Sequence, residues 1–185
     1  MFPSFRLAAR PQLFSRGFKT SAPRFVAVGD SIPKATLFEN SPGSAIDIGE
    51  ETAKGKSIIL GIPGAFSPAC SNQIPAYIKN IRAFNEKGYT KLFVVTVNDA
   101  FVTKAFGDSL IQNQVGSDQI RFFADPKGDF VKELDLSFDA SKFFGNARSK
   151  RFALLVEDGK VSKTFVEPDN VSVDVSDVSK VLDQA

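Results

Sequence analysis

Two short, uninterrupted apolar runs on either side of a helical pattern constrain the fold of this chain most strongly. SIILGI (57–62) and KLFVVTV (91–97) have the length of buried strands, and the second is rich in β-branched residues. Between them, apolar residues recur at helical spacing, at Ile74, Tyr77, Ile78, Ile81 and Phe84. A strand, a helix and a strand predict a right-handed crossover between two parallel neighbours in one sheet.

Further patterns extend this unit into a mixed α/β sheet. The runs 151–157 and 161–166 flank Asp158-Gly159, which is a strong signal for a two-residue hairpin turn. Apolar alternation at Ile32, Ala35 and Leu37 predicts a strand near the start of the domain. The remaining predicted elements are helices at 99–110, 128–136 and 175–182 and a strand at 120–124. We expect one domain with a central mixed sheet and helices on both faces.

The first 25 residues differ in charge from the rest. They contain no acidic residue and five basic ones: Arg6, Arg10, Arg16, Lys19 and Arg24. Subtracting those five from the 23 basic residues leaves 18 against 21 acidic ones, a net charge of −3. An Arg-rich, acid-free leader is typical of a mitochondrial transit peptide, so we expect a leader at 1–25 and a matrix domain at 26–185. The alternatives are a disordered basic tail and, less favoured because the remainder lacks a basic stripe, a nucleic-acid arm.

The composition excludes several kinds of chemistry. The sequence has no histidine and one cysteine, so an internal disulfide, a zinc site and Ser-His or Cys-His catalysis are excluded within one chain. No run of about 18 apolar residues occurs, so we expect no membrane span.

The single cysteine, Cys70, lies in GIPGAFSPACSNQIP (61–75). Pro68 is favoured at the first position of a helix and Ser67 is a preferred N-cap, which places Cys70 third in the helix. There the sulfur meets unpaired backbone N–H groups and the positive end of the helix dipole, and both favour the thiolate. A helix end stabilises an anion by only about 0.3–2 kcal/mol, so we expect a cation beside the sulfur as well.

Cys70 has a simpler interpretation as a small buried hydrophobe, the commonest fate of a free cysteine. Its surroundings favour a reactive group instead. Pro63 and Pro68 stiffen the turn from strand to helix, while Gly61 and Gly64 allow the backbone to approach a ligand closely. Such turns present functional groups at the carboxyl end of a sheet.

The stretch PGAFSPAC (63–70) resembles the peroxidatic signature of peroxiredoxins, in the form used by the type II, peroxiredoxin 5-like branch. The resemblance covers essentially residues 26–185. It continues, in the same order, through VNDAFVTKAFGD (97–108), FADPKGDFVKELDL (123–136) and FGNARSKRFALLVEDGKV (144–161). It implies a thioredoxin-like fold, and with one cysteine and a leader it points to a mitochondrial one-cysteine form.

The resemblance also implies roles for four residues. Cys70 takes the place of the peroxidatic cysteine, and Ser67 that of a hydroxyl which exchanges hydrogen bonds with the peroxide. Pro63 shields the site from water, and Arg151 is the cation that favours the thiolate. Two neighbouring basic residues compete with Arg151 for that role: Arg148 and Lys150.

The implied activity is a thiol-dependent peroxidase that reduces hydrogen peroxide and alkyl hydroperoxides through a sulfenic acid at Cys70. No cofactor, metal, flavin or haem is required. Many type II members carry a second, resolving cysteine, and this chain has none. We therefore expect an external thiol as reductant: glutathione, with or without glutaredoxin, or thioredoxin.

The resemblance suggests a homodimer, with contacts at Phe66, Phe101, Phe106 and Phe143, although an aromatic-rich core accounts for these residues equally well. One alternative function is a thioredoxin-fold redox sensor or holdase that relays oxidation to a partner without efficient turnover. Another is a glutathione-dependent transferase or thiol reductase. That alternative fits poorly because Ser67 stands where such sites carry the first cysteine of Cys-x-x-Cys.

Overall fold

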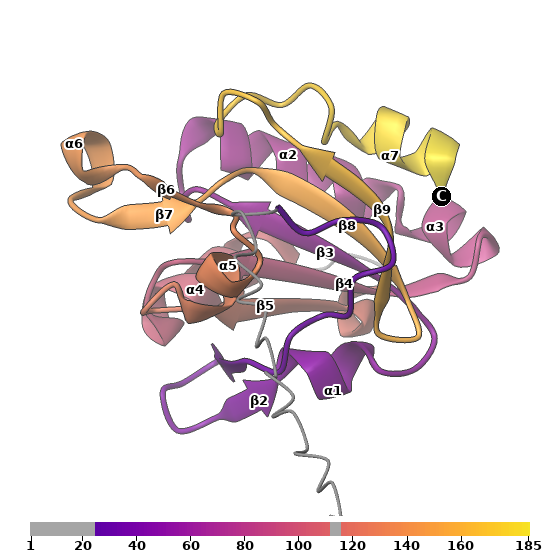
Figure 1. Cartoon of the computed structure of the whole chain (residues 1–185), viewed down its shortest axis with the longest axis horizontal. Coiled ribbons are helices and arrows are strands. Elements are labelled where there is room, and N and C mark those ends of the chain that lie inside the picture. Colours follow the sequence, from indigo (N-terminus) through magenta and orange to yellow (C-terminus); the bar gives the residue numbers. More distant parts are fainter. Residues whose placement is uncertain (1–24, 112–115) are drawn as a thin grey trace, which may run out of the picture.

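The computed structural model describes residues 25–111 and 116–185, which form a seven-stranded mixed sheet with helices on both faces (Figure 1). The strand order is β2-β1-β5-β4-β3-β8-β9, and the three inner strands β5, β4 and β3 are parallel. The other neighbours pair antiparallel. The strands are β1 (Thr36–Glu39), β2 (Ala45–Asp47), β3 (Lys56–Ile62), β4 (Tyr89–Thr96), β5 (Ile120–Ala124), β8 (Phe152–Glu157) and β9 (Lys160–Val166).

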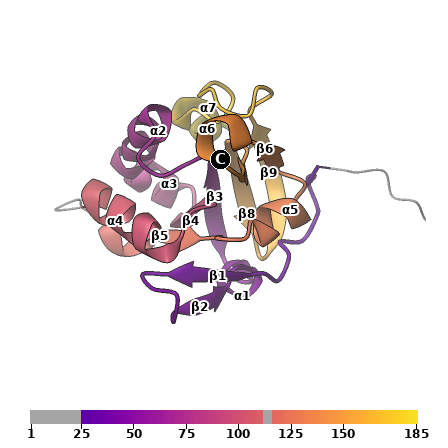
Figure 2. The ribbon, with the colours of Figure 1, turned by 90° about the vertical axis from the view of Figure 1, so that its left-hand side faces the viewer.

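Helices cover the two faces unequally. One face carries α2 (Pro68–Lys79), α3 (Ile81–Glu86), α4 (Ala100–Ile111) and α7 (Val178–Gln184). The other carries α1 (Ile48–Thr52) and α5 (Asp129–Glu133). Figure 2 shows α2, α3 and α4 on one side of the sheet and α5 on the other. The thioredoxin-like α/β architecture predicted from the sequence is therefore confirmed.

Strand β3 lies near the centre of the sheet and is buried on both faces. Ile58, Leu60 and Ile62 enter the hydrophobic core under α2 and α3, while Ile59 enters the core under α1 and α5. Because side chains alternate across a strand, a strand between two helical layers needs apolar residues at every position. Burial on both faces therefore explains the continuous apolar run from which this strand was predicted.

The connection from β3 to β4 differs from the prediction in one respect. The expected single helix is two helices, α2 and α3, which meet at Asn80 (φ −97°, ψ 8°). Pro75 also lies inside α2, where it has no N–H to donate to the carbonyl of Ser71. The crossover still joins two parallel strands, as the pattern predicts.

The β8–β9 hairpin is confirmed at its turn. Asp158 and Gly159 both have positive φ, 48° and 75°, as a tight two-residue turn requires. The last helix, α7, begins at Val178, three residues later than predicted, because Asp177 caps it by accepting from the Ser179 N–H.

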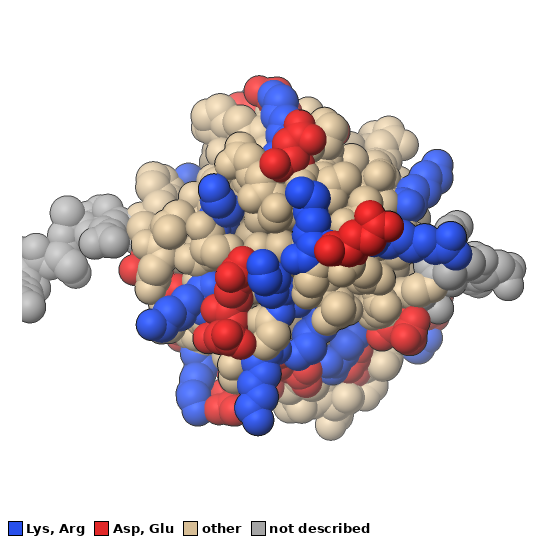
Figure 3. All heavy atoms as spheres, turned by 90° about the vertical axis from the view of Figure 1, so that its right-hand side faces the viewer, with Lys and Arg blue, Asp and Glu red and all other residues tan. Residues whose placement is uncertain are grey.

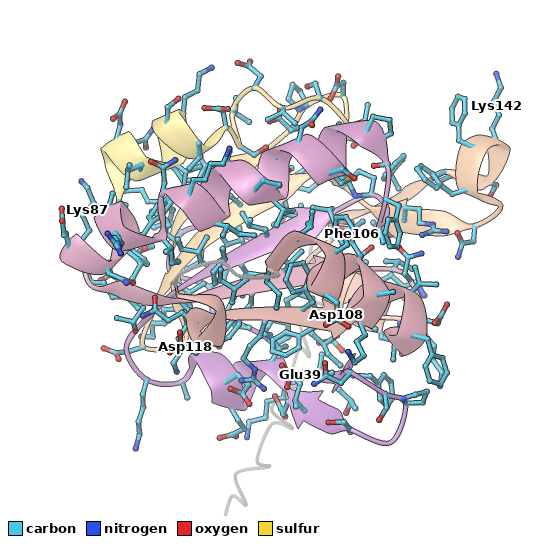
Figure 4. The ribbon with its side chains drawn as sticks, turned by 180° about the vertical axis from the view of Figure 1, so that it is seen from behind. Glu39, Lys87, Phe106, Asp108, Asp118 and Lys142 are labelled. Atoms are coloured by element: carbon cyan, nitrogen blue, oxygen red, sulfur yellow. The ribbon has the colours of Figure 1, made fainter. Side chains whose placement is uncertain are left out.

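A projecting arm was not predicted. It consists of β6 (Ser137–Asp139), α6 (Ser141–Phe144) and β7 (Ala147–Ser149), in which β6 and β7 form a separate two-stranded sheet. Figure 1 shows the arm extending from the body, and Lys142 marks its tip in Figure 4. At the opposite end of the molecule, acidic and basic side chains are interspersed over the surface (Figure 3).

Among the described helices, none combines the length and apolarity that crossing a membrane requires. The predicted leader, residues 1–25, lies outside the described residues except for Phe25.

Candidate active site

The turn from β3 to α2 places Cys70 as the sequence predicts. β3 ends at Ile62, the buried Pro63 follows, and α2 begins at Pro68 with Ser67 in an extended N-cap conformation (φ −69°, ψ 147°). Cys70 is the third residue of the helix, and its side chain is fully buried. The sulfur therefore lies at the amino end of α2, where backbone N–H groups lack helical partners.

Ser67 departs from the expected capping role. Its carbonyl accepts the N–H of Ser71 at 2.9 Å, but its hydroxyl makes no capping hydrogen bond. An N-cap serine ordinarily satisfies one of the first helical N–H groups. Here the helix does not use the hydroxyl.

Asn98, which the sequence analysis did not single out, holds the loop before α2. Its Oδ1 accepts the Ala65 N–H at 3.1 Å and the Thr96 hydroxyl at 2.8 Å. In the same loop Phe66 has φ 62°, a conformation that costs energy for a residue with a side chain. Its ring packs edge-on against Phe106 at 5.2 Å. These contacts impose the shape of the loop.

Arg151 is the cation beside the sulfur. Its Nη2 donates to Cys70 Sγ at 3.4 Å, its Nη1 to Gln73 Oε1 at 2.7 Å and its Nε to the Val171 carbonyl at 2.9 Å. The side chain is only 1% exposed, and a guanidinium keeps its charge when buried. Because Arg151 immediately precedes β8, the pairing of β8 with β3 carries it to the start of α2.

The two competing basic residues lie elsewhere. Arg148 belongs to the arm, where its Nη1 donates to the Val97 carbonyl at 2.8 Å and its guanidinium covers the ring of Phe144. Lys150 lies over the ring of Phe25, 4.3 Å from the centroid. Of the three candidates, only Arg151 contacts Cys70.

One predicted aromatic contact is wrong. Phe106 is 1% exposed and lies between α4 and α2 in the core (Figure 4), so it is not available at the surface of the monomer. The other three are exposed at their side chains: Phe66 by 54%, Phe101 by 65% and Phe143 by 79%. In the part of the chain that the structure describes, no group of three or more histidine, cysteine, aspartate or glutamate side chains is placed to hold a metal ion.

A fully buried cysteine at the amino end of a helix, with an arginine against its sulfur, defines a thiol-based redox protein on a thioredoxin-like sheet. The Redoxin family model matches residues 27–182. The chain is 46% identical to peroxisomal membrane associated protein 20 of Schizosaccharomyces pombe over 157 residues, which cover 85% of this chain and 97% of that protein.

Solved structures agree. Peroxiredoxin 5 from Alvinella pompejana superposes with a TM-score of 0.72 and 35% identity, over 79% of this chain and 92% of that one. Reduced Prx3 from Vibrio vulnificus in complex with H₂O₂ gives 0.77 and 32%, over 87% and 100%. This chain belongs to the Redoxin family. Within that family it is a peroxiredoxin of the type II, peroxiredoxin 5-like branch, and so a thiol-dependent peroxidase.

Proposed function

We propose that the Cys70 thiolate attacks the terminal oxygen of a hydroperoxide, either hydrogen peroxide or an alkyl hydroperoxide. A bond forms between sulfur and that oxygen, the O–O bond breaks, and the leaving oxygen takes a proton to become water or an alcohol. Cys70 is left as a sulfenic acid. The sulfur gives up the electron pair that reduces the peroxide.

The observation that carries this proposal is the contact of 3.4 Å between Arg151 Nη2 and Cys70 Sγ in a buried site at the start of α2. A guanidinium has five N–H donors, and three are used by Cys70, Gln73 and Val171. The remaining donors can hold a peroxide oxygen and stabilise charge on the leaving oxygen. The free hydroxyl of Ser67 is a further donor, and the buried Pro63 excludes water.

We further propose that the sulfenic acid is reduced by an external thiol, because the sequence holds one cysteine. The first thiol forms a mixed disulfide with Cys70 and releases water. A second thiol then attacks the first thiol's sulfur, which frees the Cys70 thiol and releases the two external thiols as a disulfide. Glutathione, with or without glutaredoxin, and thioredoxin are the candidate reductants. Residues 1–25 would act as a transit peptide to the mitochondrial matrix, and the exposed rings of Phe66, Phe101 and Phe143 would support a homodimer.

Trapping of the sulfenic acid tests the first step. The reduced full chain is mixed with one equivalent of hydroperoxide, and labelling by a dimedone-type reagent is followed by intact mass. We expect rapid labelling at Cys70, no labelling in Cys70→Ser, and a loss of about 10²–10³-fold in rate in Arg151→Ala. Arg148→Ala is the matched control and should keep the parental rate. Oxidation no faster than that of a free small thiol would show that Cys70 is only a packed hydrophobe.

A recycling assay then separates the reductants. Peroxide consumption is compared with thioredoxin, with glutathione alone and with glutathione plus glutaredoxin. Sustained turnover with one of them identifies the reductant. Sulfenic acid formation without turnover in any of them would favour the redox sensor or holdase instead.

A further inference from the structure

Behind the Arg151 guanidinium lies a row of three buried polar side chains from two distant parts of the chain, α2 and the loop that follows β9. Gln73 accepts from Arg151 through Oε1, and its Nε2 donates to both the hydroxyl oxygen and the backbone carbonyl of Ser176, each at 3.0 Å. The Ser176 hydroxyl in turn donates to Glu167 Oε1 at 2.7 Å. Gln73 is 5% exposed, Ser176 0% and Glu167 1%. The row therefore runs from the reactive sulfur to a carboxylate entirely within the protein.

Its two ends fix the direction of every hydrogen bond between them. An arginine can only donate, so the Gln73 oxygen must face it and the Gln73 NH₂ must face Ser176. An ionised carboxylate can only accept, so the Ser176 hydroxyl must give its proton to Glu167 and accept from Gln73. Each hydrogen bond in the row thus has only one possible direction. The Gln73 amide and the Ser176 hydroxyl are therefore each held in one orientation, which they could otherwise reverse.

Glu167 is suited to be the fixed end. Besides the Ser176 hydroxyl, its Oε1 accepts the N–H groups of Asp174 at 2.7 Å and Ser176 at 2.8 Å. Burial opposes its ionisation, but the hydrogen bonds from Ser176 and the backbone around Asp174 hold the pKa of Glu167 below its ordinary value. The carboxylate thus organises the 167–176 loop without a salt bridge among the described residues.

The same loop also grips the backbone of Arg151. The Arg151 N–H donates to the Asn170 carbonyl at 2.8 Å, and the Arg151 carbonyl accepts the Glu167 N–H at 3.0 Å. Together with the hydrogen bond from Arg151 Nε to the Val171 carbonyl, these contacts fix both the backbone position of Arg151 and the orientation of its side chain. Gln73 adds a third constraint on the guanidinium, because its Oε1 accepts from Nη1.

We propose that Glu167, Ser176 and Gln73 are positioning residues for the peroxidase reaction, which hold the Arg151 guanidinium in the orientation that presents its Nη2 to Cys70 and its remaining donors to the peroxide. This inference rests on the proposed role of Arg151. None of the three forms a hydrogen bond with the sulfur, whose donor is Arg151 Nη2, and they act through the guanidinium.

The test compares the rate constant for sulfenic acid formation at Cys70 in the full chain and its variants, each corrected for the folded fraction. Ser176→Ala removes the hydroxyl that donates to Glu167 and keeps the carbonyl, while Glu167→Ala removes the carboxylate that accepts from that hydroxyl. We expect each to slow oxidation by at least about tenfold, since small misplacements of a reacting group are costly. Ser176→Thr, which restores a hydroxyl, should recover most of the rate.

Tyr77→Phe is the matched control. The Tyr77 hydroxyl donates to the Ser176 carbonyl at 2.7 Å, so its loss disturbs the same residue without interrupting the row. We expect a loss of stability with the oxidation rate kept within about twofold, because the donors around Arg151 remain. An equal slowing in Tyr77→Phe and Ser176→Ala would overturn the proposal by showing a merely structural role.

A double-mutant comparison separates this proposal from the one on which it rests. If Ser176 acts through Arg151, Ser176→Ala should slow oxidation in the parent and have no further effect in Arg151→Ala. If Arg151→Ala is slow but Ser176→Ala and Glu167→Ala keep the parental rate, the positioning role is wrong and the role of Arg151 stands. If Arg151→Ala itself keeps the parental rate, both proposals fall.

Discussion

The ring of Phe152 occupies the space that a side chain on Gly61 would need. A Cβ placed on Gly61 would lie 2.0 Å from Phe152 Cε1, and the two residues are paired across β3 and β8. Gly61 leads into the loop that carries Cys70, and Phe152 directly follows Arg151. The missing side chain on Gly61 therefore leaves room for the ring of Phe152, the residue next to Arg151 in the chain.

Gly61→Ala should therefore disturb stability and chemistry together. We expect the free energy of unfolding to fall by about 1–3 kcal/mol, as overpacking in a closed core does. Sulfenic acid formation should slow as well, because Phe152 can move only by carrying Arg151 with it. Urea denaturation and stopped-flow oxidation measure the two effects. Gly43→Ala, whose new Cβ would meet nothing closer than 3.8 Å, is the control and should change neither.

The effect of replacing Asn98 should depend on whether the new side chain keeps an oxygen at the position of Oδ1. Both of its contacts to the loop and to Thr96 are accepted by Oδ1, so Asn98→Asp keeps them and Asn98→Ala loses both. We expect Asn98→Ala to lose about 1–2 kcal/mol of stability and to oxidise more slowly, as the strained Phe66 backbone relaxes. Asn98→Asp should stay close to the parent. Equal behaviour of the two variants would show that the amide nitrogen, or bulk alone, matters.

The contribution of Glu167 to stability should depend on pH in a defined direction. The pKa of Glu167 is lowered in the folded protein from its ordinary value of 4.5. The ionised carboxylate therefore stabilises the fold fully at pH values above 4.5, and this stabilisation is lost as the pH falls through the folded pKa. The difference in unfolding free energy between the parent and Glu167→Gln should be constant near about pH 7 and shrink in acid. Urea titrations at a series of pH values measure it. A difference that grows in acid would contradict the lowered pKa.

Phe143 should matter for assembly but not for the fold of one chain. Its side chain is 79% exposed on the projecting arm, so Phe143→Glu removes little buried surface. We expect sedimentation velocity to show a shift from dimer to monomer. The midpoint temperature of thermal unfolding of the variant should be close to that of the parent extrapolated to low protein concentration. Val28→Glu, which changes an apolar residue outside the arm that is 61% exposed, should leave the proposed dimer intact.

The core of the fold was open to prediction because its signals are local. Strands β3 and β4 each contain an uninterrupted apolar run, and the Asp158-Gly159 turn needs no distant partner. The arm was missed because β6 and β7 have three residues each, too few to show a period. The division between α2 and α3 was missed because the apolar spacing continues across Asn80.

The site was predictable only in part for the same reason. Ser67 and Pro68 predict the start of a helix and so place Cys70 in its first turn. Helical spacing then places Gln73 one turn further on. Nothing in the sequence brings residues 167–176 against α2, since Ser176 meets Gln73 across 103 positions. The choice of Arg151 over Arg148 rested on the resemblance. The structure explains it: Arg148 lies in β7, whereas Arg151 immediately precedes β8.

Pro75 removes one backbone hydrogen bond from the middle of α2. The Ser71 carbonyl has no helical N–H to accept, so the turn that holds Cys70 is tied to the rest of the helix by fewer backbone bonds than its length suggests. In native-state hydrogen exchange, the amides of residues 70–72 should therefore lose protection well before those of 77–79. A sulfur that is closed to solvent in the resting protein would then become reachable by a bulky thiol through a motion confined to one turn, with the sheet beneath it undisturbed.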